Sequence, residues 1–568
     1  MKRNIDNLAG RAFDLIVIGG GIYGSCVAWE AALRGLSVAL VEQGDFGHAT
    51  SANSQKIVHG GFRYLQHADL TRMRESIRER KILMRIAPHL VHPLPCVLPT
   101  TRAGLHRRTI MRLALACYDA IAWDRNIGVM DPQKRIPRGR IVSREECLRL
   151  APGVSDPEIT GGAVWYDGQI YNSERLTLAF LRAAADAGAC LANHAQVTGF
   201  LQEGRRILGV RAQDALTGRT VEVRGRIVVN TAGPWITRVL GLALQSQPTA
   251  HTPLSKTINL VTTRALTNGH AVSVALPYRP GAHGQDTGNR RLYLTPWRGR
   301  TIIGSAHLVF RDHPDACRVT PEEIKGLLAD VNTAYPGAAL TREEISFVHM
   351  GLMPFEDRDG RGNPAQLSRR YRIRDHQDDG LEGLISVEGI KYTTARDVAQ
   401  KVVDRVMQRL RRRPVPSRSA ATPVAGGHIA SFEEYLATVL RERPHGLDED
   451  ILRQLVYAYG SDYTQVLQVA ADQVDWLQRV SPASLVIKAQ VVYAVREELA
   501  QTLQDVVLRR TELGTLGHPG RDALEACAGV MAQELGWSRQ QIERELEETE
   551  RAFARILAQP LQAGAGQR

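Results

Sequence analysis

The segment "FDLIVIGGGIYG" (Phe13–Gly24) carries the clearest structural signal in this chain. Its first half is an apolar run, rich in β-branched residues and ending in three glycines, which predicts a buried strand and a tight turn. The next residues, Ile22–Gly35, have helical spacing and a terminal glycine, and "LSVALVEQ" (Leu36–Gln43) is a second apolar run. Strand, turn, helix and strand within about 30 residues form a βαβ unit, so an α/β fold is predicted.

Three glycines of this turn, Gly19, Gly21 and Gly24, fit the pattern GxGxxG. The first permits the tight turn, the second lets the backbone approach a pyrophosphate, and the third lets the helix pack closely on the strand. The amino terminus of the helix then faces the anion. Glu42, at the end of the second strand, is placed to accept hydrogen bonds from ribose hydroxyls, so the segment predicts a dinucleotide site.

A second glycine turn distinguishes between the dinucleotides that this motif can bind. The motif alone fits both NAD and FAD. It lies at the extreme amino terminus, however, and "VVNTAGPW" (Val228–Trp235) follows much later in the chain. A nucleotide fold that is split in this way encloses an extended FAD between distant segments, so FAD is the predicted cofactor.

Composition and charge narrow the class of protein. The chain has 568 residues, and its contents of 43% hydrophobic and 23% charged residues are ordinary for a soluble globular protein with more than one domain. The net charge of +12 fits an anionic membrane face, an anionic substrate or simply an arginine-rich surface, and no nucleic-acid-reading motif accompanies it. The seven cysteines are scattered without a CxxC pair, which argues against disulfides and a metal site and predicts a reducing cytoplasm.

Membrane association depends on two helical stretches. The first residues, "MKRNIDNLAGRAFD", lack the apolar core of a secretory signal, and no apolar run reaches the roughly 20 residues that span a bilayer. Residues 71–86 and 105–123 mix arginines with Ile, Leu, Met and Trp. Such helices lie either in a membrane interface or on the protein core, and both interpretations remain open. The predicted location is the cytoplasm, with peripheral attachment to the inner face of the cell membrane left open.

Changes in pattern divide the chain. Strand-rich stretches at residues 189–229 and 256–309 are typical of inserted sheets. Residues 411–431, "RRRPVPSRSAATPVAGGHIAS", are rich in Pro, Ser, Gly and Ala, which predicts a linker. Beyond the linker the pattern is helical almost throughout, so a separate helical domain is predicted.

Six motifs occur in an order that resembles a known family. They are "DLIVIGGGIYG", "SANSQKIVHGGFRYLQ", "WYDGQIYNSERL", "VNTAGPW", "PWRGRTIIG" and "IKYTTARD". Their order is similar to that in FAD-dependent glycerol-3-phosphate dehydrogenases and oxidases. The later segment "ASLVIKAQVVYAVREELAQTLQDVVLRRTELG" resembles the helical domain of the same family, so the resemblance covers about residues 12–550.

This resemblance implies a fold and a chemistry. The fold is an α/β, split Rossmann-like FAD-binding domain of the D-amino-acid-oxidase type, with an antiparallel β-sheet substrate domain over the flavin and an all-α C-terminal domain. The implied chemistry is hydride transfer from an alcohol carbon to flavin N5, followed by electron transfer to a quinone or O2. The implied boundaries are an oxidoreductase domain at 1–410, a linker at 411–431 and a helical domain at 432–560. Within the oxidoreductase domain, the FAD-binding segments are expected at about 12–90, 175–240 and 350–410, and the substrate-sheet segments at about 91–174 and 241–349.

The resemblance also assigns residues to the cofactor. A cation and a positive helix end at the pyrimidine edge of the flavin would stabilise its anionic reduced form, and Lys391 would supply that cation. The residues implied to hold FAD are Gly19, Gly21, Ile22, Gly24, Glu42 and Gln43 at the ADP half, Thr50, Ser51 and Ser54 at the pyrophosphate and ribityl chain, Val197, Ala232, Gly233 and Trp235 at the adenine side, and Ile57, His59, Gly60, Gly61, Gly351, Lys391, Tyr392 and Thr393 near the ring.

The substrate side follows from the same comparison. The implied catalytic residues are Arg63, Lys391 and His59, and His59 either takes the hydroxyl proton or only packs against the flavin. The residues implied to face the substrate are Arg63, Tyr64, Asn259, His307, Met353 and Lys391.

The chain departs from the family pattern on this side. Where the family has Gly-Val-Arg-Pro, with the arginine on the substrate phosphate, this chain has Gly351–Pro354 with methionine at the arginine position. Residues 256–259, 304–307 and 389–394 also differ from the usual Lys-Gly-x-His, Gly-Thr-Thr-Asp and Gly-Gly-Lys-Leu-Thr-Thr. Either Arg369 or Arg370 replaces the missing donor, or the substrate has changed.

The predicted function is therefore an FAD-dependent dehydrogenase or oxidase acting on a secondary alcohol. The expected partner is a small-molecule substrate, such as a polyol phosphate or a related polar metabolite, and a quinone and a membrane surface are left open as further partners. Nucleic acid is not expected, and a homodimer is left open. The alternatives are an amine or amino-acid oxidase on the same scaffold and a flavin-binding protein without turnover.

Overall fold

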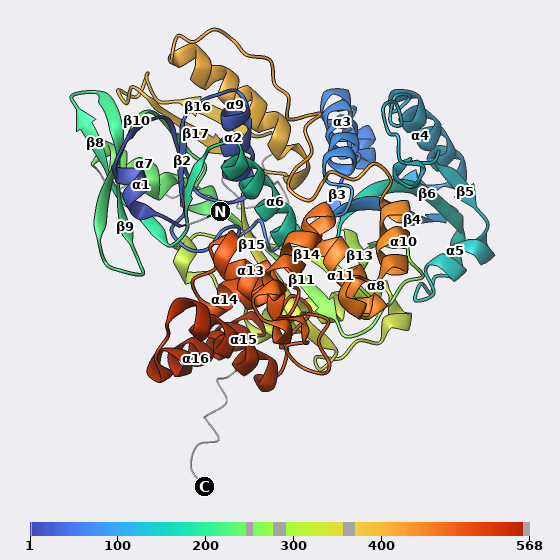
Figure 1. Cartoon of the computed structure of the whole chain (residues 1–568). Coiled ribbons are helices and arrows are strands. Elements are labelled where there is room, and N and C mark those ends of the chain that lie inside the picture. Colours follow the sequence, from blue (N-terminus) through green and yellow to red (C-terminus); the bar gives the residue numbers. More distant parts are fainter. Residues whose placement is uncertain (2, 246–253, 277–290, 356–369, 560–568) are drawn as a thin grey trace.

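The computed structural model describes residues 1, 3–245, 254–276, 291–355 and 370–559. Figure 1 shows two β-sheets with helices packed around them and a helical carboxyl-terminal region (orange to red) beside them. The predicted fold class, an α/β domain with two sheets and a helical C-terminal domain, is confirmed.

The first sheet is built around the predicted βαβ unit. β1 (Ala12–Ile18) pairs in parallel with β2 (Val38–Val41) and with β10 (Thr220–Asn230), and α2 (Ile22–Leu33) is the crossover between β1 and β2. Every residue of β1 after Ala12 is buried because both faces of the sheet are covered. The other strands of this sheet are β7 (Cys190–Ala192), β8 (Ala195–Glu203), β9 (Arg206–Asp214), β16 (Arg372–Asp375) and β17 (Leu384–Glu388).

Helices from distant parts of the chain cover this sheet. On one face α2 packs between α6 (Ser173–Asp186) and α9 (Ala395–Arg409). On the other face α1 (Ile5–Ala9) and α7 (Ile236–Leu244) close a second apolar cluster with β8 and β9. The chain therefore leaves this sheet and returns to it, as the split nucleotide fold requires.

The second sheet follows the order β15-β11-β14-β13-β12-β4-β6-β3, with β5 paired to β6. All of its pairs are antiparallel except one, since β12 runs parallel to β4. The predicted antiparallel sheet departs from the observed one at this pair because two separate chain segments each supply half of the sheet and meet there. The strands are β3 (Ile57–Val58), β4 (Val91–Thr101), β5 (Arg140–Val142), β6 (Ile159–Ile170), β11 (Leu254–Thr262), β12 (Ala271–Ala275), β13 (Arg291–Trp297), β14 (Arg300–Phe310) and β15 (Ile345–Pro354).

The observed strands shift two of the expected segment boundaries. β3 lies in the stretch expected to bind FAD, yet it pairs with β6 of the second sheet. β15 runs across the boundary expected at residues 349 and 350. Both strands therefore tie the two sheets together.

Two pairs of helices flank the second sheet. α3 (Leu70–Ile86) and α4 (Arg108–Ile121) lie at one end of the molecule and share a small apolar cluster (Figure 1). α5 (Arg144–Leu150) and α8 (Pro321–Ala334) pack on the apolar face of the sheet, which leaves the opposite face free to line a cavity. Among the described residues, no helix combines the length and the apolar character that crossing a bilayer requires.

The carboxyl-terminal region has its own core. Val261, Trp297 and Phe347 of the second sheet join this core, so the helical region rests on that sheet. The segment expected to be a linker has no helix or strand between residues 411 and 431, and its backbone bonds to Ile86 and Ala179 hold it on the first domain. The helices are α10 (Phe432–Glu442), α11 (Glu449–Tyr459), α12 (Tyr463–Gln468), α13 (Lys488–Glu498), α14 (Leu503–Asp505), α15 (Arg521–Leu535) and α16 (Arg539–Ile556).

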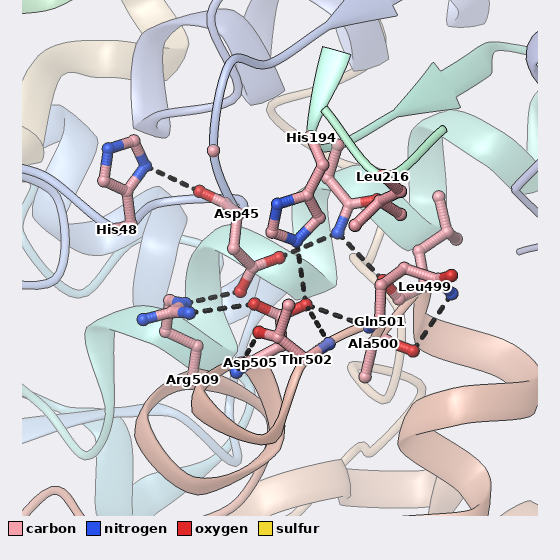
Figure 2. Close-up of polar contacts among 12 residues, drawn as sticks. Asp45, His48, His194, Leu216, Leu499, Ala500, Gln501, Thr502, Asp505 and Arg509 are labelled. Atoms are coloured by element: carbon pink, nitrogen blue, oxygen red, sulfur yellow. Dashed lines mark hydrogen bonds and ion pairs between the residues drawn. The ribbon is translucent and has the colours of Figure 1, made fainter. Parts of the chain in front are cut away.

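Buried ion pairs join the helical region to the first sheet, and Figure 2 shows several of them. Arg510 binds both carboxylate oxygens of Asp45 at 2.6 Å. Arg509 also contacts Asp45 and lies 2.9 Å from Asp505, whose other oxygen is 2.9 Å from Nε2 of His194. Together with the pair Arg175–Glu498, we call these residues the interdomain ion network.

One part of this network has the spacing of a metal site. Ligand atoms of Asp45, His194 and Asp505 all lie within 4.8 Å of one another. Both carboxylates, however, already face guanidinium groups of Arg509 and Arg510. An added cation would lie beside two positive charges, so we interpret the cluster as an ion network.

Candidate functional site

A cavity of about 1090 Å³ lies between the two sheets. It opens at the carboxyl ends of β1, β2 and β17, which is where parallel α/β sheets bind ligands. Ligand cavities usually measure about 300–1,000 Å³, so this one is large enough for a dinucleotide and a small substrate.

The predicted glycine turn forms one end of the cavity. Gly19 has a φ of +101°, and a Cβ there would lie 2.8 Å from the carbonyl oxygen of Thr231. Gly21 caps α2 and lines the cavity, together with Ile22 of the first helical turn. Gly24 does not line it; a Cβ on Gly24 would lie 1.9 Å from the oxygen of Gly19, so this glycine permits close packing of helix and strand.

The acidic residue after β2 is buried at the same end. Glu42 accepts hydrogen bonds from the backbone nitrogens of Gly20 at 2.7 Å and Gly44 at 2.8 Å. Each bonded oxygen keeps a further lone pair, and Glu42 and Gln43 both line the cavity. The carboxylate is thus fixed where a ribose would approach the turn.

The loop after β2 supplies hydroxyl groups. Ser51 Oγ accepts a hydrogen bond from the backbone nitrogen of Ile22 at 3.0 Å, and Thr50 donates to the carbonyl of Leu352 at 2.9 Å. These residues and Ser54 line the cavity, as predicted for the pyrophosphate side. The buried Nε2 of Gln55, which also lines the cavity, has no hydrogen-bond partner among the described residues.

The opposite wall of this end carries the residues expected beside the adenine. Val197 of β8 and the short turn Gly233–Trp235 both line the cavity, and so does Ala232. The positive φ of Gly233, +53°, lets the chain turn away from β10 at this point.

The middle of the cavity is bordered by residues 57–61. Ile57, His59 and Gly61 line it, whereas Gly60 faces the core, where a Cβ would lie 2.2 Å from Arg80. Gly351 does not line the cavity either; its neighbour Met353 does. The glycines of this stretch therefore let the backbone lie close to the cavity, and Gly60 leaves room for Arg80 in the core behind it.

His59 has an acidic neighbour that the sequence analysis did not single out. Its Nδ1 lies 4.0 Å from Asp167 Oδ2, and its backbone nitrogen donates to Thr393 Oγ1 at 3.1 Å. Desolvation, together with Lys391 and Arg63, holds the pKa of His59 below its ordinary value despite Asp167. The imidazole is thus neutral near pH 7 and can accept a proton.

Asp167 is itself firmly held. It accepts hydrogen bonds from the backbone nitrogen of Gly60 at 2.5 Å and from Trp165 Nε1 at 3.2 Å, and Arg80 lies 3.3 Å away. Its position within "WYDGQIYNSERL" was visible in the sequence, but its contact with His59 depends on the β3–β6 pairing.

Lys391 begins the short turn Tyr392–Thr394, and all three of Lys391, Tyr392 and Thr393 line the cavity. The ammonium lies 4.0 Å from the ring centroid of Tyr64. Desolvation first, and then Arg72 and Arg63, lower the pKa of Lys391 to about 7. No carboxylate pairs with its ammonium in the part of the chain that the structure describes.

Tyr23, in the first turn of α2, fixes the backbone of this loop. Its hydroxyl accepts hydrogen bonds from the nitrogens of Ile390 at 3.1 Å and Lys391 at 3.2 Å, and donates to the oxygen of Lys391 at 2.8 Å. Gly389 leaves room for the tyrosine ring, since a Cβ there would lie 2.1 Å from it.

The residues expected to face the substrate lie on the cavity-lining side of the second sheet and at positions 63 and 64. Asn259, His307 and Met353 line the cavity together with Arg63 and Tyr64, as predicted. Of the two arginines proposed to replace the missing phosphate donor, Arg370 does not line the cavity and Arg369 lies outside the described residues. The lining residues that the sequence analysis missed include Gln55, His106, Trp165, Asp167, Arg291 and Ser305.

This arrangement fits FAD. The glycine turn leaves a cradle that side chains would fill. Within the described ranges, the buried amide nitrogen of Gln55 lacks a partner, and the cations that border the middle of the cavity have no carboxylate partner. The glycine turn would hold the pyrophosphate, Glu42 a ribose, and residues 57–61 with Lys391 the ring.

Comparisons with known proteins agree with this fit. The family model for FAD dependent oxidoreductases matches residues 14–389, and that for the C-terminal domain of alpha-glycerophosphate oxidase matches residues 417–542. A glycerol-3-phosphate dehydrogenase of Synechocystis sp. is 31% identical over 555 residues, covering 96% of this chain and 97% of that protein. An aerobic glycerol-3-phosphate dehydrogenase of Staphylococcus aureus is 29% identical, covering 96% of this chain and 95% of that protein.

A solved structure is similar over the whole length. The glycerol-3-phosphate dehydrogenase from Bacillus halodurans complexed with FAD has a TM-score of 0.77 and 25% identity, and the match covers 99% of this chain and 98% of that one. The resemblance drawn from the sequence motifs is confirmed. The chain belongs to the FAD-dependent oxidoreductase family and is an enzyme that uses FAD.

Proposed function

We propose that this enzyme oxidises the secondary alcohol of a polyol phosphate, with glycerol 3-phosphate as the first candidate. The observation that carries the proposal is the group of cations around the middle of the cavity, Arg63, Lys391 and Arg291, none of which has a carboxylate partner among the described residues. The names of the similar dehydrogenases support the choice of substrate class.

The chemistry divides between cofactor and protein. FAD, when bound, supplies the acceptor for the hydride that leaves the alcohol carbon. His59 takes the hydroxyl proton, and Asp167 stabilises the imidazolium that forms. Lys391 and Arg63 stabilise negative charge in the cavity, both the charge that develops during the reaction and the charge that an anionic ligand brings. The alcohol is thus oxidised to a ketone without a base from solution.

An anaerobic reduction screen tests this proposal. The purified holoenzyme is mixed with glycerol 3-phosphate, other polyol phosphates, glycerol, L-amino acids and amines, and the loss of oxidised-flavin absorbance is followed. We expect rapid reduction by at least one polyol phosphate. Reduction by an amino acid or amine alone would replace the proposal with the amino-acid oxidase alternative, and no reduction by any compound would favour a flavin-binding protein without turnover.

We also propose that the enzyme is cytoplasmic and binds peripherally to the inner face of the cell membrane, through α4 and the residues on either side of it. Apolar side chains are exposed here, including Leu113 at 66%, Trp123 at 72% and Met130 at 82%. Exposed Arg107, Arg108 and Arg112 would meet anionic lipid headgroups. The other exposed apolar residues of this surface are Leu105, Ile110 and Ile127.

The position of α4 favours a quinone as the electron acceptor. Leu105 and Ile110 belong to the exposed apolar surface and also line the cavity. An acceptor dissolved in the membrane would therefore reach the cavity without crossing water. Turnover with a soluble quinone analogue, compared with O2, tests this acceptor.

Flotation with vesicles tests membrane binding. We expect wild-type protein to float with vesicles containing phosphatidylglycerol, and the double substitution L113E/W123E to lower the bound fraction about tenfold. The control is Leu216→Glu, which changes an exposed leucine on a turn of the first sheet. Equal flotation of all three proteins would contradict the proposed surface.

A further inference from the structure

Arg291 is a cavity-lining guanidinium held in place before any ligand arrives. Its Nε donates to Ser273 Oγ at 2.8 Å, and Nη2 donates to the backbone oxygen of Ser273 at 2.9 Å. Nη1 lies 3.3 Å from Nε2 of His106, which follows the β4 strand. Three contacts on two sides therefore fix the plane of this group.

Among the described residues, two donors of Arg291 have no partner. A guanidinium has five N–H groups, and the three contacts to Ser273 and His106 leave one on Nη1 and one on Nη2. In the described parts of the chain no carboxylate lies within ion-pair distance. Desolvation, and to a smaller extent the charge of Arg63, lower the pKa of Arg291 although Tyr293 opposes them. The half-buried guanidinium has no carboxylate among the described residues to offset its desolvation.

The strand pattern shows that this cation belongs to the cavity. Arg291 and Tyr293 alternate with the apolar Leu292 and Leu294, which pack in the core on the far side of the sheet. Ser273, opposite Tyr293 on β12, and Ser305, next to Gly304 on β14, line the cavity on the same face. On the described parts of β12, β13 and β14, this face therefore presents hydroxyl and guanidinium donors and no carboxylate.

This position differs from the one that the family resemblance indicated. There the arginine stands where this chain has Met353, on β15, whereas Arg291 is on β13, three strands away in the order β15-β11-β14-β13. Arg63 is near enough for its charge to affect Arg291. A group bound by both arginines would thus lie towards the β12–β13 side of the sheet.

We propose that Arg291, together with Arg63, binds the phosphate monoester of the substrate and is the residue that makes this enzyme select phosphorylated polyols. A phosphate offers three acceptor oxygens and a double negative charge, which match two guanidinium forks and the nearby hydroxyls of Tyr293 and Ser305. The inference rests on the proposed function, because it names the group by which that substrate is recognised.

The test uses the holoenzyme and the substitution Arg291→Gln. Affinity for inorganic phosphate is measured by titration calorimetry on the oxidised protein, and anaerobic flavin reduction is measured with glycerol 3-phosphate and with uncharged glycerol. We expect R291Q to weaken phosphate binding and to raise KM for the phosphorylated substrate about 10- to 100-fold, since charge-assisted hydrogen bonds are lost. The ratio of kcat/KM for glycerol 3-phosphate to that for glycerol should fall by a similar factor, because glycerol carries no phosphate for Arg291 to bind.

A matched control is Arg300→Gln. Arg300 is also a half-buried arginine, on the neighbouring strand β14, but it does not line the cavity. R300Q should bind phosphate as the wild type does. If R291Q loses FAD or does not fold, Ser273→Ala, which removes only the hydroxyl that orients Arg291, should weaken phosphate binding about two- to fivefold.

The outcomes separate the inference from the proposed function. Wild-type affinity for phosphate in R291Q, or equal losses in R291Q and R300Q, would overturn the role of Arg291 even if polyol phosphates reduce the flavin. If no polyol phosphate reduces the flavin but R291Q still binds phosphate more weakly, the anion site stands and the proposed function fails.

Discussion

The interdomain ion network and the cavity both contain arginines, but the two sets differ in burial and in their partners. Arg175 and Arg510 are buried, whereas Arg291 is half-buried and Arg63 is exposed. Arg175 contacts both oxygens of Glu498 at 2.7 and 2.9 Å, and Arg510 contacts both oxygens of Asp45. In the cavity, Arg63 and Arg291 have no such carboxylate among the described residues. Paired cations hold the domains together, whereas unpaired cations are available to a ligand.

This difference follows from the cost of burying charge. A buried ion stays in a folded protein when a partner of opposite sign offsets its desolvation. In the network the partner is another segment of the same chain. In the cavity, the exposed Arg63 and the half-buried Arg291 keep part of their hydration, so they need no partner from the chain and can bind an anionic cofactor or substrate.

The largest effect is expected in the network. Arg175→Ala would remove both close contacts of the buried Glu498, leave Arg182 at 3.7 Å as its ion-pair partner, and remove the guanidinium that lies 4.1 Å from the ring centroid of Tyr459. We expect a loss of about 3–5 kcal/mol in the free energy of unfolding, measured by chemical denaturation. Arg539→Ala, at an exposed pair on α16, is the control and should leave stability unchanged. Equal stability of both variants would contradict the stabilising role of the paired arginines in the interdomain ion network.

A large kinetic effect is expected in the cavity. Lys391→Ala removes a cation that has no carboxylate to stabilise, so the fold and FAD content should be kept. Anaerobic flavin reduction should slow about 10²- to 10³-fold, because electrostatic stabilisation in the site is lost. Lys401→Ala, which removes a lysine paired with Asp397 outside the cavity, should reduce normally. An unchanged rate in K391A would remove Lys391 from the site.

Binding of a phosphorylated substrate should depend on pH. The pKa of Lys391 is lowered to about 7 by desolvation and by Arg72 and Arg63, so the ammonium is charged below that pH and neutral above it. Affinity should therefore fall as pH rises from 7 to 9, by at most about tenfold per unit. Lys391→Arg stays charged and should give a flat profile over the same range. The same pH dependence in both proteins would assign the titration to another group.

The smallest effect is expected at His194. Burial alone would lower its pKa, but Asp505 and Asp45 raise it above the ordinary value. A raised pKa means that the stabilising pair is complete below about pH 6.5 and is lost as pH rises through the higher folded value. Relative to His194→Gln, the wild type should lose about 1 kcal/mol of stability between pH 6 and 9 in denaturation experiments. Parallel curves for the two proteins would show that the pair contributes no proton-linked stability.

The parts of the molecule that were predictable from sequence are those encoded by neighbouring residues. The βαβ turn at Gly19–Gly24 and the loop at residues 50–61 are local patterns, and both lie in the cavity as expected. The helical carboxyl-terminal region follows from helical spacing alone. These signals work because a glycine turn or an amphipathic helix forms from its own segment.

The parts that were missed depend on contacts between distant strands. Arg291 alternates with leucines in a way that marks one face of β13, but only the order of the sheet shows that this face lines the cavity. Asp167 reaches His59 through the pairing of β3 with β6. Asp45 and Arg510 are 465 residues apart, and no local pattern joins them.

The hydroxyl of Tyr23 has a practical consequence for protein engineering. One tyrosine in the cofactor helix fixes the loop that carries Lys391, so these two segments behave as a single module that redesign should leave intact. Asn259, Arg291 and Ser305 lie on strands of the other sheet, and their hydrogen bonds to described residues are not to either segment. A library aimed at new alcohols can therefore vary those three positions while the cofactor machinery stays constant.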